Sequence, residues 1–274
     1  MIEAFFLGRA PEVFLVALAL SAARPLAFIM VTPIFTRFGL QAGLIRGALL
    51  LAFSAPVFIN LQLELASLPA LSNFEFVVIL AKELLIGLLL ALVLGIPLWA
   101  VAAAGDMIDF QRGASMAELV EPGSGDVTSP TGTLFFLLIA LLLASSDWFR
   151  DVLLHNLYLT YHHWPVLEPI PPLKLSAGAG VLALLDAIIR TGLILSIPIF
   201  GSMLLTEISL ALAGKYIQQL NIMFLAMGVK QIVYAILLPV YFASLIYFMR
   251  GEIAELTNTI EVLKGFLNPD EVAR

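Results

Sequence analysis

Few residues of this chain are of the types that carry out chemistry. It has no cysteine, and its three histidines all fall within residues 155–163. None of the sequence patterns of zinc proteases, serine hydrolases or phosphate-binding loops is present. The histidines lie beside Tyr158, Tyr161 and Trp164, a mixture typical of the aromatic belt at a membrane surface. The sequence therefore predicts a protein that is not an enzyme and that carries no cofactor or metal.

Two carboxylates, Asp106 and Asp109, are spaced to share one face of a helix. Such a pair could exchange a proton or bind a cation, but a solvated helix end that leads into a loop is the simpler interpretation. Residues 122–126, Pro-Gly-Ser-Gly-Asp, then predict a turn, because proline presets φ and glycine permits positive φ. Residues 129–132, Ser-Pro-Thr-Gly, predict the start of the next helix.

Long apolar segments must position these polar residues. Of the 274 residues, 61% are apolar and 12% are charged, whereas an ordinary soluble domain has roughly 45–50% and 25%. The mean hydropathy is +1.02. Most of the apolar blocks approach the ~20 residues that a helix needs to cross a membrane, so we expect an all-α polytopic membrane protein in contact with lipid. The blocks are 13–35, 44–63, 76–104, 133–144, 178–205 and 222–249.

The fourth block is too short to span a membrane alone, since its helix would be only about 18 Å long. It could continue as a helix through 145–151 towards Tyr161, with Asp147 and Arg150 paired on one face. The positive residues divide almost evenly between the two sides of a six-span arrangement, so they indicate little about orientation. A net charge of -6 argues against a nucleic-acid partner.

Charged residues lie inside or at the edges of the apolar blocks, where an isolated charge costs about 2.5–3.5 kcal/mol. They could join helices and subunits together, or they could line an ion or proton pathway. Their even spread along the chain favours the first explanation. Asp186 and Arg190 are spaced to pair with each other, and the adjacent Lys82 and Glu83 are expected to face different neighbours. The candidates for interhelical or intersubunit contacts are Arg24, Arg46, Asp186, Arg190, Glu207, Lys215 and Lys230.

Prolines and glycines interrupt the apolar blocks. A proline removes a backbone hydrogen bond and kinks a helix, and glycines let membrane helices pack closely. We therefore expect kinked or broken helices arranged as hairpins. The prolines concerned are Pro25, Pro33, Pro56, Pro97, Pro198 and Pro239.

Three parts of the chain together resemble the FliR/SctT family of type III secretion export-apparatus proteins. The first is Arg24-Pro25 through Phe35 with the arginine-led run 46–52, which is similar to the family's first hairpin. The second is 105–132, above all Gln111-Arg112-Gly113-Ala114-Ser115-Met116-Ala117, and it resembles the SctT branch more than FliR. The third is Thr206-Glu207-Ile208 with Tyr216 through Phe224, where Gln218 replaces a proline that the family usually carries.

This resemblance implies an all-helical subunit of a helical, pore-forming export gate in the bacterial inner membrane, projecting to its periplasmic side. SctR-like and SctS-like subunits and an SctU-like switch subunit would be its partners, and unfolded secreted proteins its cargo. The family's corresponding loop projects into the pore as a plug. Its match in this chain comprises Phe110, Gln111, Arg112, Gly113, Ala114, Ser115 and Met116.

The predicted organisation is a single membrane-embedded domain, 1–274. It would consist of hairpin-rich halves at 1–104 and 133–250, a plug-like loop at 105–132 and a polar tail at 251–274. The alternative function is a secondary transporter of a small solute that uses the intramembrane charges for coupling. That alternative predicts two halves related by symmetry, and no such internal similarity is visible in the sequence.

Overall fold

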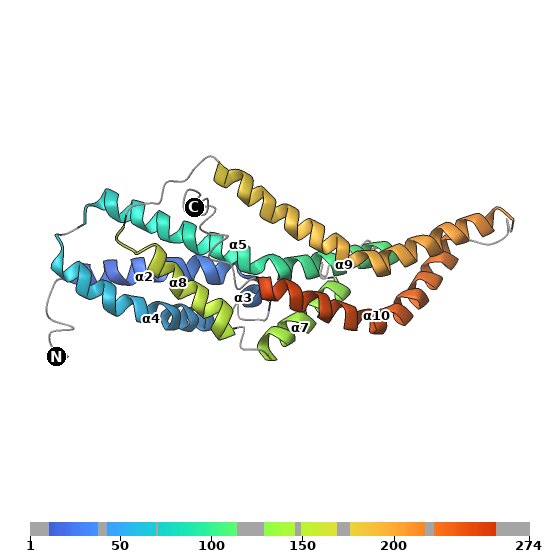
Figure 1. Cartoon of the computed structure of the whole chain (residues 1–274), viewed down its shortest axis with the longest axis horizontal. Coiled ribbons are helices and arrows are strands. Elements are labelled where there is room, and N and C mark those ends of the chain that lie inside the picture. The colour runs from blue at the N-terminus through green and yellow to red at the C-terminus, as the bar shows by residue number, and fades with distance from the viewer. Residues whose placement is uncertain are drawn as a thin grey trace. The chain divides into compact units, whose positions relative to one another are not determined.

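The structure of the chain is a computed structural model. Regular structure in the described part of the chain is helical throughout, without any strand (Figure 1). This confirms the prediction of an all-α protein. The described residues are 11–37, 43–69, 71–113, 129–145, 149–168, 176–216 and 222–255.

Five of the described helices are long and apolar enough to cross a membrane. This confirms the prediction of a polytopic membrane protein. Each of the five contains an internal proline, and α10 is visibly bent in Figure 1. The five are α2 (Pro11–Val31), α4 (Gly43–Ser67), α5 (Asn73–Arg112), α9 (Ser176–Gly214) and α10 (Ile222–Glu255).

Three shorter helices follow one another around the expected fourth block. The first, α7 (Pro130–Ser145), has 16 residues, so at 1.5 Å per residue it is about 24 Å long and falls short of the ~30 Å hydrocarbon core. Helical structure resumes as a π-helix, η1 (Phe149–Leu154), and continues as α8 (His155–His163). Arg150 pairs with Asp151 (Nε to Oδ1 2.8 Å), and its expected partner Asp147 lies outside the described residues.

The chain forms two compact units that are interleaved in the sequence. The first comprises 1–95, 147–181 and 256–274, and the second comprises 96–146 and 182–255. We expected two consecutive halves instead. The difference arises because α5 and α9 are longer than one membrane crossing and each contributes residues to both units. Each unit is described below by itself.

The first unit is built on the antiparallel pair of α2 and α4, which lie side by side in Figure 1. The short helix α3 (Pro33–Arg37) follows α2 directly. Ala17 and Leu20 of α2 are buried with Leu61 and Leu65 of α4. A T-shaped aromatic contact also joins Phe14 and Phe58, with ring centroids 5.3 Å apart, a geometry that aromatic pairs prefer.

The second unit packs α7, α9 and α10 around the second half of α5. A methyl group built on Gly105 of α5 would lie 2.3 Å from the backbone of Gly132 in α7, so the two helices touch backbone to backbone, as small residues permit. The ring of Phe135 in α7 lies 6.0 Å from that of Tyr241 in α10. The Tyr241 hydroxyl donates a hydrogen bond to the Leu195 carbonyl of α9.

The C-terminal end of α5 corrects one expectation. The connecting loop was expected to begin at residue 105, but α5 continues to Arg112. Asp109 and Arg112 form an ion pair within the last turn, which stabilises the helix there. The helix ends where Gly113 takes φ 79°, the left-handed conformation common just after a helix C-terminus. Phe110, Gln111 and Arg112 are therefore helical.

Candidate functional site

A polar cluster of the second unit lies where α5 ends and α7 begins. Ser129 caps α7, since its Oγ accepts a hydrogen bond from the Gly132 N–H at 2.9 Å. Pro130 occupies the first helical position, where its missing N–H costs nothing. These contacts confirm the helix start that the sequence predicted at 129–132.

The carboxylate of Asp109 is the centre of this cluster and is only 3% exposed. Its oxygens accept hydrogen bonds from the Ser129 hydroxyl at 2.6 Å, from the Thr131 N–H at 2.8 Å and from the Thr131 hydroxyl. Arg112 Nε lies 2.7 Å from Oδ1 and is not aligned for a hydrogen bond, so charge holds that contact. A carboxylate at a helix N-terminus also interacts favourably with the helix dipole.

The two carboxylates that the sequence could not separate therefore differ. Asp106 is exposed and makes no side-chain hydrogen bond within the described part of the chain. It therefore fits the prediction of a solvated helix end. Asp109 is buried, and its carboxylate accepts hydrogen bonds from Ser129 and Thr131. The interpretation as a solvated helix end is therefore wrong for Asp109, because a helix distant in the sequence supplies its donors.

Side chains of α10 complete the cluster. The Tyr234 hydroxyl lies 2.8 Å from the Thr131 hydroxyl. The guanidinium carbon of Arg112 lies 4.5 Å from the centroid of the Tyr234 ring, within the range of a cation–π contact. Arg112 also donates a hydrogen bond to the Gln231 side chain at 3.5 Å. One helical turn of α10 thus contacts both α5 and α7.

Lys230, 8% exposed, holds the C-terminal end of α5. Its Nζ donates to the Gln111 carbonyl at 2.9 Å and lies 3.3 Å from the Glu207 carboxylate of α9. Glu207 also accepts a hydrogen bond from the Gln111 side chain at 3.1 Å. A lysine that binds the last carbonyls of a helix complements its dipole, so Lys230 acts on α5 as Asp109 acts on α7.

The first unit contains a separate buried cluster, formed by Arg24 of α2 and two residues of α5. Glu83 receives two hydrogen bonds from Arg24, both 2.9 Å long, and both side chains are 0% exposed. Lys82 Nζ lies 3.2 Å from Glu83 and donates to three carbonyls between 165 and 168. As expected, Lys82 and Glu83 face different neighbours, and the ion pair between them joins both to one cluster.

Residues 160–164, at the end of α8, complete the surroundings of Arg24. Its Nη1 donates to the Thr160 hydroxyl and its Nη2 to the Trp164 carbonyl, each at 2.8 Å. The guanidinium carbon lies 3.9 Å from the centroid of the Tyr161 ring. Burial raises the pKa of Tyr161 well above its usual value, so this ring stays neutral beside the cation. Both Arg24 and Glu83 were recognised in the sequence as charges in apolar blocks, but their pairing was not predicted.

The other predicted charges are distributed differently. Arg46 Nε is buried and has no hydrogen-bond partner among the described residues. Lys215 is exposed at the end of α9. Asp186 and Arg190 are exposed and line one depression of the second unit, and no ion pair joins them where the structure is described. Of the predicted plug, Ala114, Ser115 and Met116 lie outside the described residues.

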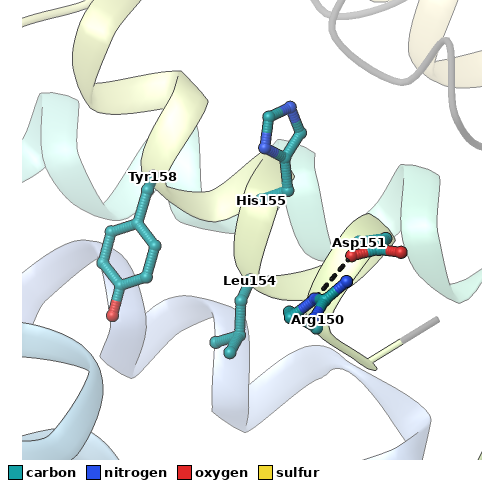
Figure 2. Close-up of a pocket in the computed structure, with 5 residues that line it drawn as sticks. All are labelled: Arg150, Asp151, Leu154, His155 and Tyr158. Carbon is teal, nitrogen blue, oxygen red and sulfur yellow. Dashed lines mark hydrogen bonds and ion pairs between the residues drawn. The ribbon is translucent and has the colours of Figure 1, made fainter. Parts of the chain in front are cut away.

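Figure 2 shows a pocket beside η1 and α8 in the first unit. Arg150 and Asp151 are already paired with each other at 2.8 Å. His155 is exposed nearby, and Tyr158 points away from that pair; burial raises the Tyr158 pKa. Within the described ranges, no three His, Cys, Asp or Glu side chains are grouped as a metal site requires. This pocket therefore offers less organised chemistry than the two clusters above.

Comparison with known proteins identifies a family. Residues 15–256 match the model of the bacterial export proteins, family 1. The chain is 33% identical to the Yop proteins translocation protein T of Yersinia pestis over 66% of this chain and 72% of that protein. It is 27% identical to the secretion system apparatus protein SsaT of Salmonella typhimurium over 84% and 88%. It is 30% identical to the flagellar biosynthetic protein FliR of Bacillus subtilis over 73% and 76%.

Proposed function

The chain belongs to the bacterial export proteins, family 1, and we propose that it is a pore-forming subunit of the export gate of a type III secretion system. Its family and its five membrane-length helices make it a membrane protein with a role in protein export. The proposed portal admits unfolded proteins across the bacterial inner membrane and projects to its periplasmic side. Its other subunits resemble SctR, SctS and SctU.

The observation that carries the gating part of this proposal is the polar cluster of the second unit. A protein-conducting pore must pass an unfolded chain and yet retain ions when idle, which requires a deformable plug on a firm attachment. The predicted plug residues 110–116 lie at and after the end of α5, and contacts of Lys230 and Asp109 hold α5 and α7, the helices on either side of the connection. A loop that only connected two hairpins would not require charged groups at its ends, because charged groups are energetically costly inside a membrane protein.

The contacts of the individual residues support different roles for them in the proposed plug. Phe110 is 74% exposed at the end of α5, where an apolar ring is available to close a pore. Gln111 and Arg112 contact Glu207 and Gln231 of the same chain. We therefore propose that these two residues anchor the plug. The proposed plug continues through 114–116, where Met116 supplies a flexible, polarizable side chain.

Deleting residues 111–116 tests this function. We expect the complex still to assemble, in a reduced amount because Lys230 and Glu207 lose Gln111, and the inner membrane to become permeable to ions, because the proposed closure is removed. An ion-sensitive dye in cells measures the permeability. Deletion of the six C-terminal residues 269–274 is the length-matched control and should leave permeability unchanged. A plug deletion that assembles normally and leaks no more than this control would exclude the plug.

Lys230→Ala is expected to reduce copurification of the chain with its companion subunits. The substitution leaves the Gln111 carbonyl and the Glu207 carboxylate without their shared cation. The Gln111 carbonyl is partly buried, so its loss lies towards the lower end of the about 1–3 kcal/mol that an unsatisfied buried group costs. Glu207→Ala should have a smaller effect, since the Glu207 side chain is 49% exposed. Arg250→Ala, at an exposed position of α10, is the control. Equal recovery of all three variants would rule out a role of this ion pair in assembly.

The alternative function, transport of a small solute with Asp186, Arg190, Glu207 and Lys230 as coupling groups, is disfavoured. The relatives are named for translocation, secretion and flagellar biosynthesis. Asp186 and Arg190 are exposed, and Glu207 and Lys230 pair with each other beside Gln111. The export gate therefore accounts for more of the observations.

A further inference from the structure

We infer that Asp109 is the positioning residue of the α5–α7 junction, and that its carboxylate sets the separation between the end of α5 and the start of α7. The inference rests on the proposed function for its consequence, because the proposed plug residues 110–116 begin in the last turn of α5 at this junction. Closure would then depend on Asp109, which is not itself one of the residues 110–116. Asp109 acts through Thr131 and contacts no exported protein in this account.

Asp109 links the two helices by contacts that few other side chains could make. It lies on the last turn of α5, and its two oxygens engage the backbone N–H of Thr131 together with the hydroxyls of Ser129 and Thr131. A charged acceptor bonded to a backbone N–H at a helix N-terminus forms a strong hydrogen bond. The first-turn N–H groups of α7 have no partner within their own helix. The position of α7 along α5 is therefore fixed at this point.

The glycine contact makes the same junction sensitive to small displacements. Gly105 of α5 lies against Gly132 of α7, one turn from Asp109, with no room for a methyl group. The backbones touch there, so α7 cannot approach α5 more closely, and the Asp109 hydrogen bonds prevent it from moving away. Together the two contacts define one separation.

A third helix, α10, contacts both sides of the junction. The Tyr234 hydroxyl hydrogen-bonds with the Thr131 hydroxyl, and the Arg112 guanidinium lies over the Tyr234 ring. Lys230 donates a hydrogen bond to the Gln111 carbonyl. An anion thus binds the N-terminal end of α7 and a cation binds the C-terminal end of α5, each with the sign that the helix dipole favours. Movement of α10 would disturb both ends together.

The chain supplies a matched control for Asp109. Asp106 lies nearly one turn earlier on the same helix, is exposed and makes no side-chain hydrogen bond within the described residues. Asp106→Asn changes charge and shape just as Asp109→Asn does. Any difference between the two variants therefore reports the contacts of Asp109 and not the loss of a negative charge on α5.

Distance measurement between two labelled cysteines tests the inference. The chain has no cysteine of its own, so Phe110→Cys and Thr133→Cys, both at exposed positions of the second unit, accept spin labels selectively. The pair is introduced into the full chain within its assembled complex. Asp109→Asn should shift the distance distribution to longer values and broaden it, and Asp106→Asn should leave it unchanged.

Substitutions of Thr131 keep the test decisive if Asp109→Asn fails to fold. Thr131→Val removes the hydroxyl that contacts both Asp109 and Tyr234 but keeps the backbone N–H, so a smaller shift in the same direction is expected. Thr131→Ser should restore the original distance. Unchanged distances in both Asp109→Asn and Thr131→Val would overturn the inference.

Ion permeability, measured on the Asp109 and Thr131 variants without the two cysteines so that Phe110 is kept, separates this inference from the proposed function. A longer distance with increased permeability supports both. A longer distance with permeability at the level of the unaltered complex supports the positioning role of Asp109 and excludes the plug. The failure of one proposal is thus distinguishable from the failure of the other.

Discussion

Replacing Glu83 with alanine is expected to prevent the chain from accumulating in the membrane. The substitution leaves Arg24 and Lys82, which are 0% and 1% exposed, without the carboxylate that both contact. Removing one partner of a buried ion pair costs about 3–5 kcal/mol, a large part of the 5–15 kcal/mol by which folded proteins are stable. The amount of protein in the membrane fraction measures the effect.

Two further variants refine this prediction. Glu64→Ala removes an exposed glutamate of α4 in the same unit and should leave the amount of protein unchanged. Glu83→Gln keeps one acceptor oxygen for Arg24 and loses only the charge, so it should fall between the two alanine variants. Accumulation of Glu83→Ala to the level of Glu64→Ala would show that the cluster is not needed for folding.

Gly105→Ala is expected to destabilise the second unit. The added methyl carbon would lie 2.3 Å from both the Cα and the N of Gly132, and backbone atoms cannot rotate away as a side chain can. The helices α5 and α7 must therefore separate, which also strains the hydrogen bonds of Asp109. Overpacking of this kind costs about 1–3 kcal/mol, occasionally more. A lower midpoint of thermal unfolding in detergent would report it.

The matched control for this prediction is Gly201→Ala in α9, where nothing lies within 4 Å of the added carbon. Alanine is a better helix former than glycine by about 1 kcal/mol, so this variant should be as stable as the original chain or slightly more so. If the two glycine variants unfold at the same temperature, the backbone contact between α5 and α7 does not exist as described.

The helices themselves were predictable from the sequence, because a long apolar block in a membrane protein has no stable alternative to a helix. The ends of those helices were not. The apolar block ended at residue 104 and the plug-like loop was predicted from residue 105, yet contacts from α10 and the Asp109–Arg112 pair extend α5 to Arg112. Where distant helices supply the capping groups, a local pattern cannot locate a helix end.

Local sequence patterns did not predict the partners of the charged residues either. The spacing of four residues suggested that Asp186 and Arg190 would pair. Both are exposed, however, and no ion pair joins them in the described structure. Arg24 instead pairs with Glu83, 59 residues away, and Lys230 pairs with Glu207 on another helix. In a bundle of long helices the neighbours of a buried charge are set by packing between helices.

The resemblance to the FliR/SctT family, which the sequence motifs indicated, is confirmed by the match over residues 15–256. Residues 129–132 were correctly predicted as a helix start because serine before proline is a local signal. The different roles of Asp106 and Asp109 carried no such signal. Only the burial of one and the exposure of the other separate them.

The electrical conductance of the purified complex in a planar bilayer tests the central claim most directly. The complex with the unaltered chain should be silent, because residues 110–116 are proposed to close the pore. The complex that lacks 111–116 should conduct ions while keeping its full set of subunits. A deletion complex of normal composition that stays as silent as the original would contradict the account of this chain as the subunit that holds the export gate shut.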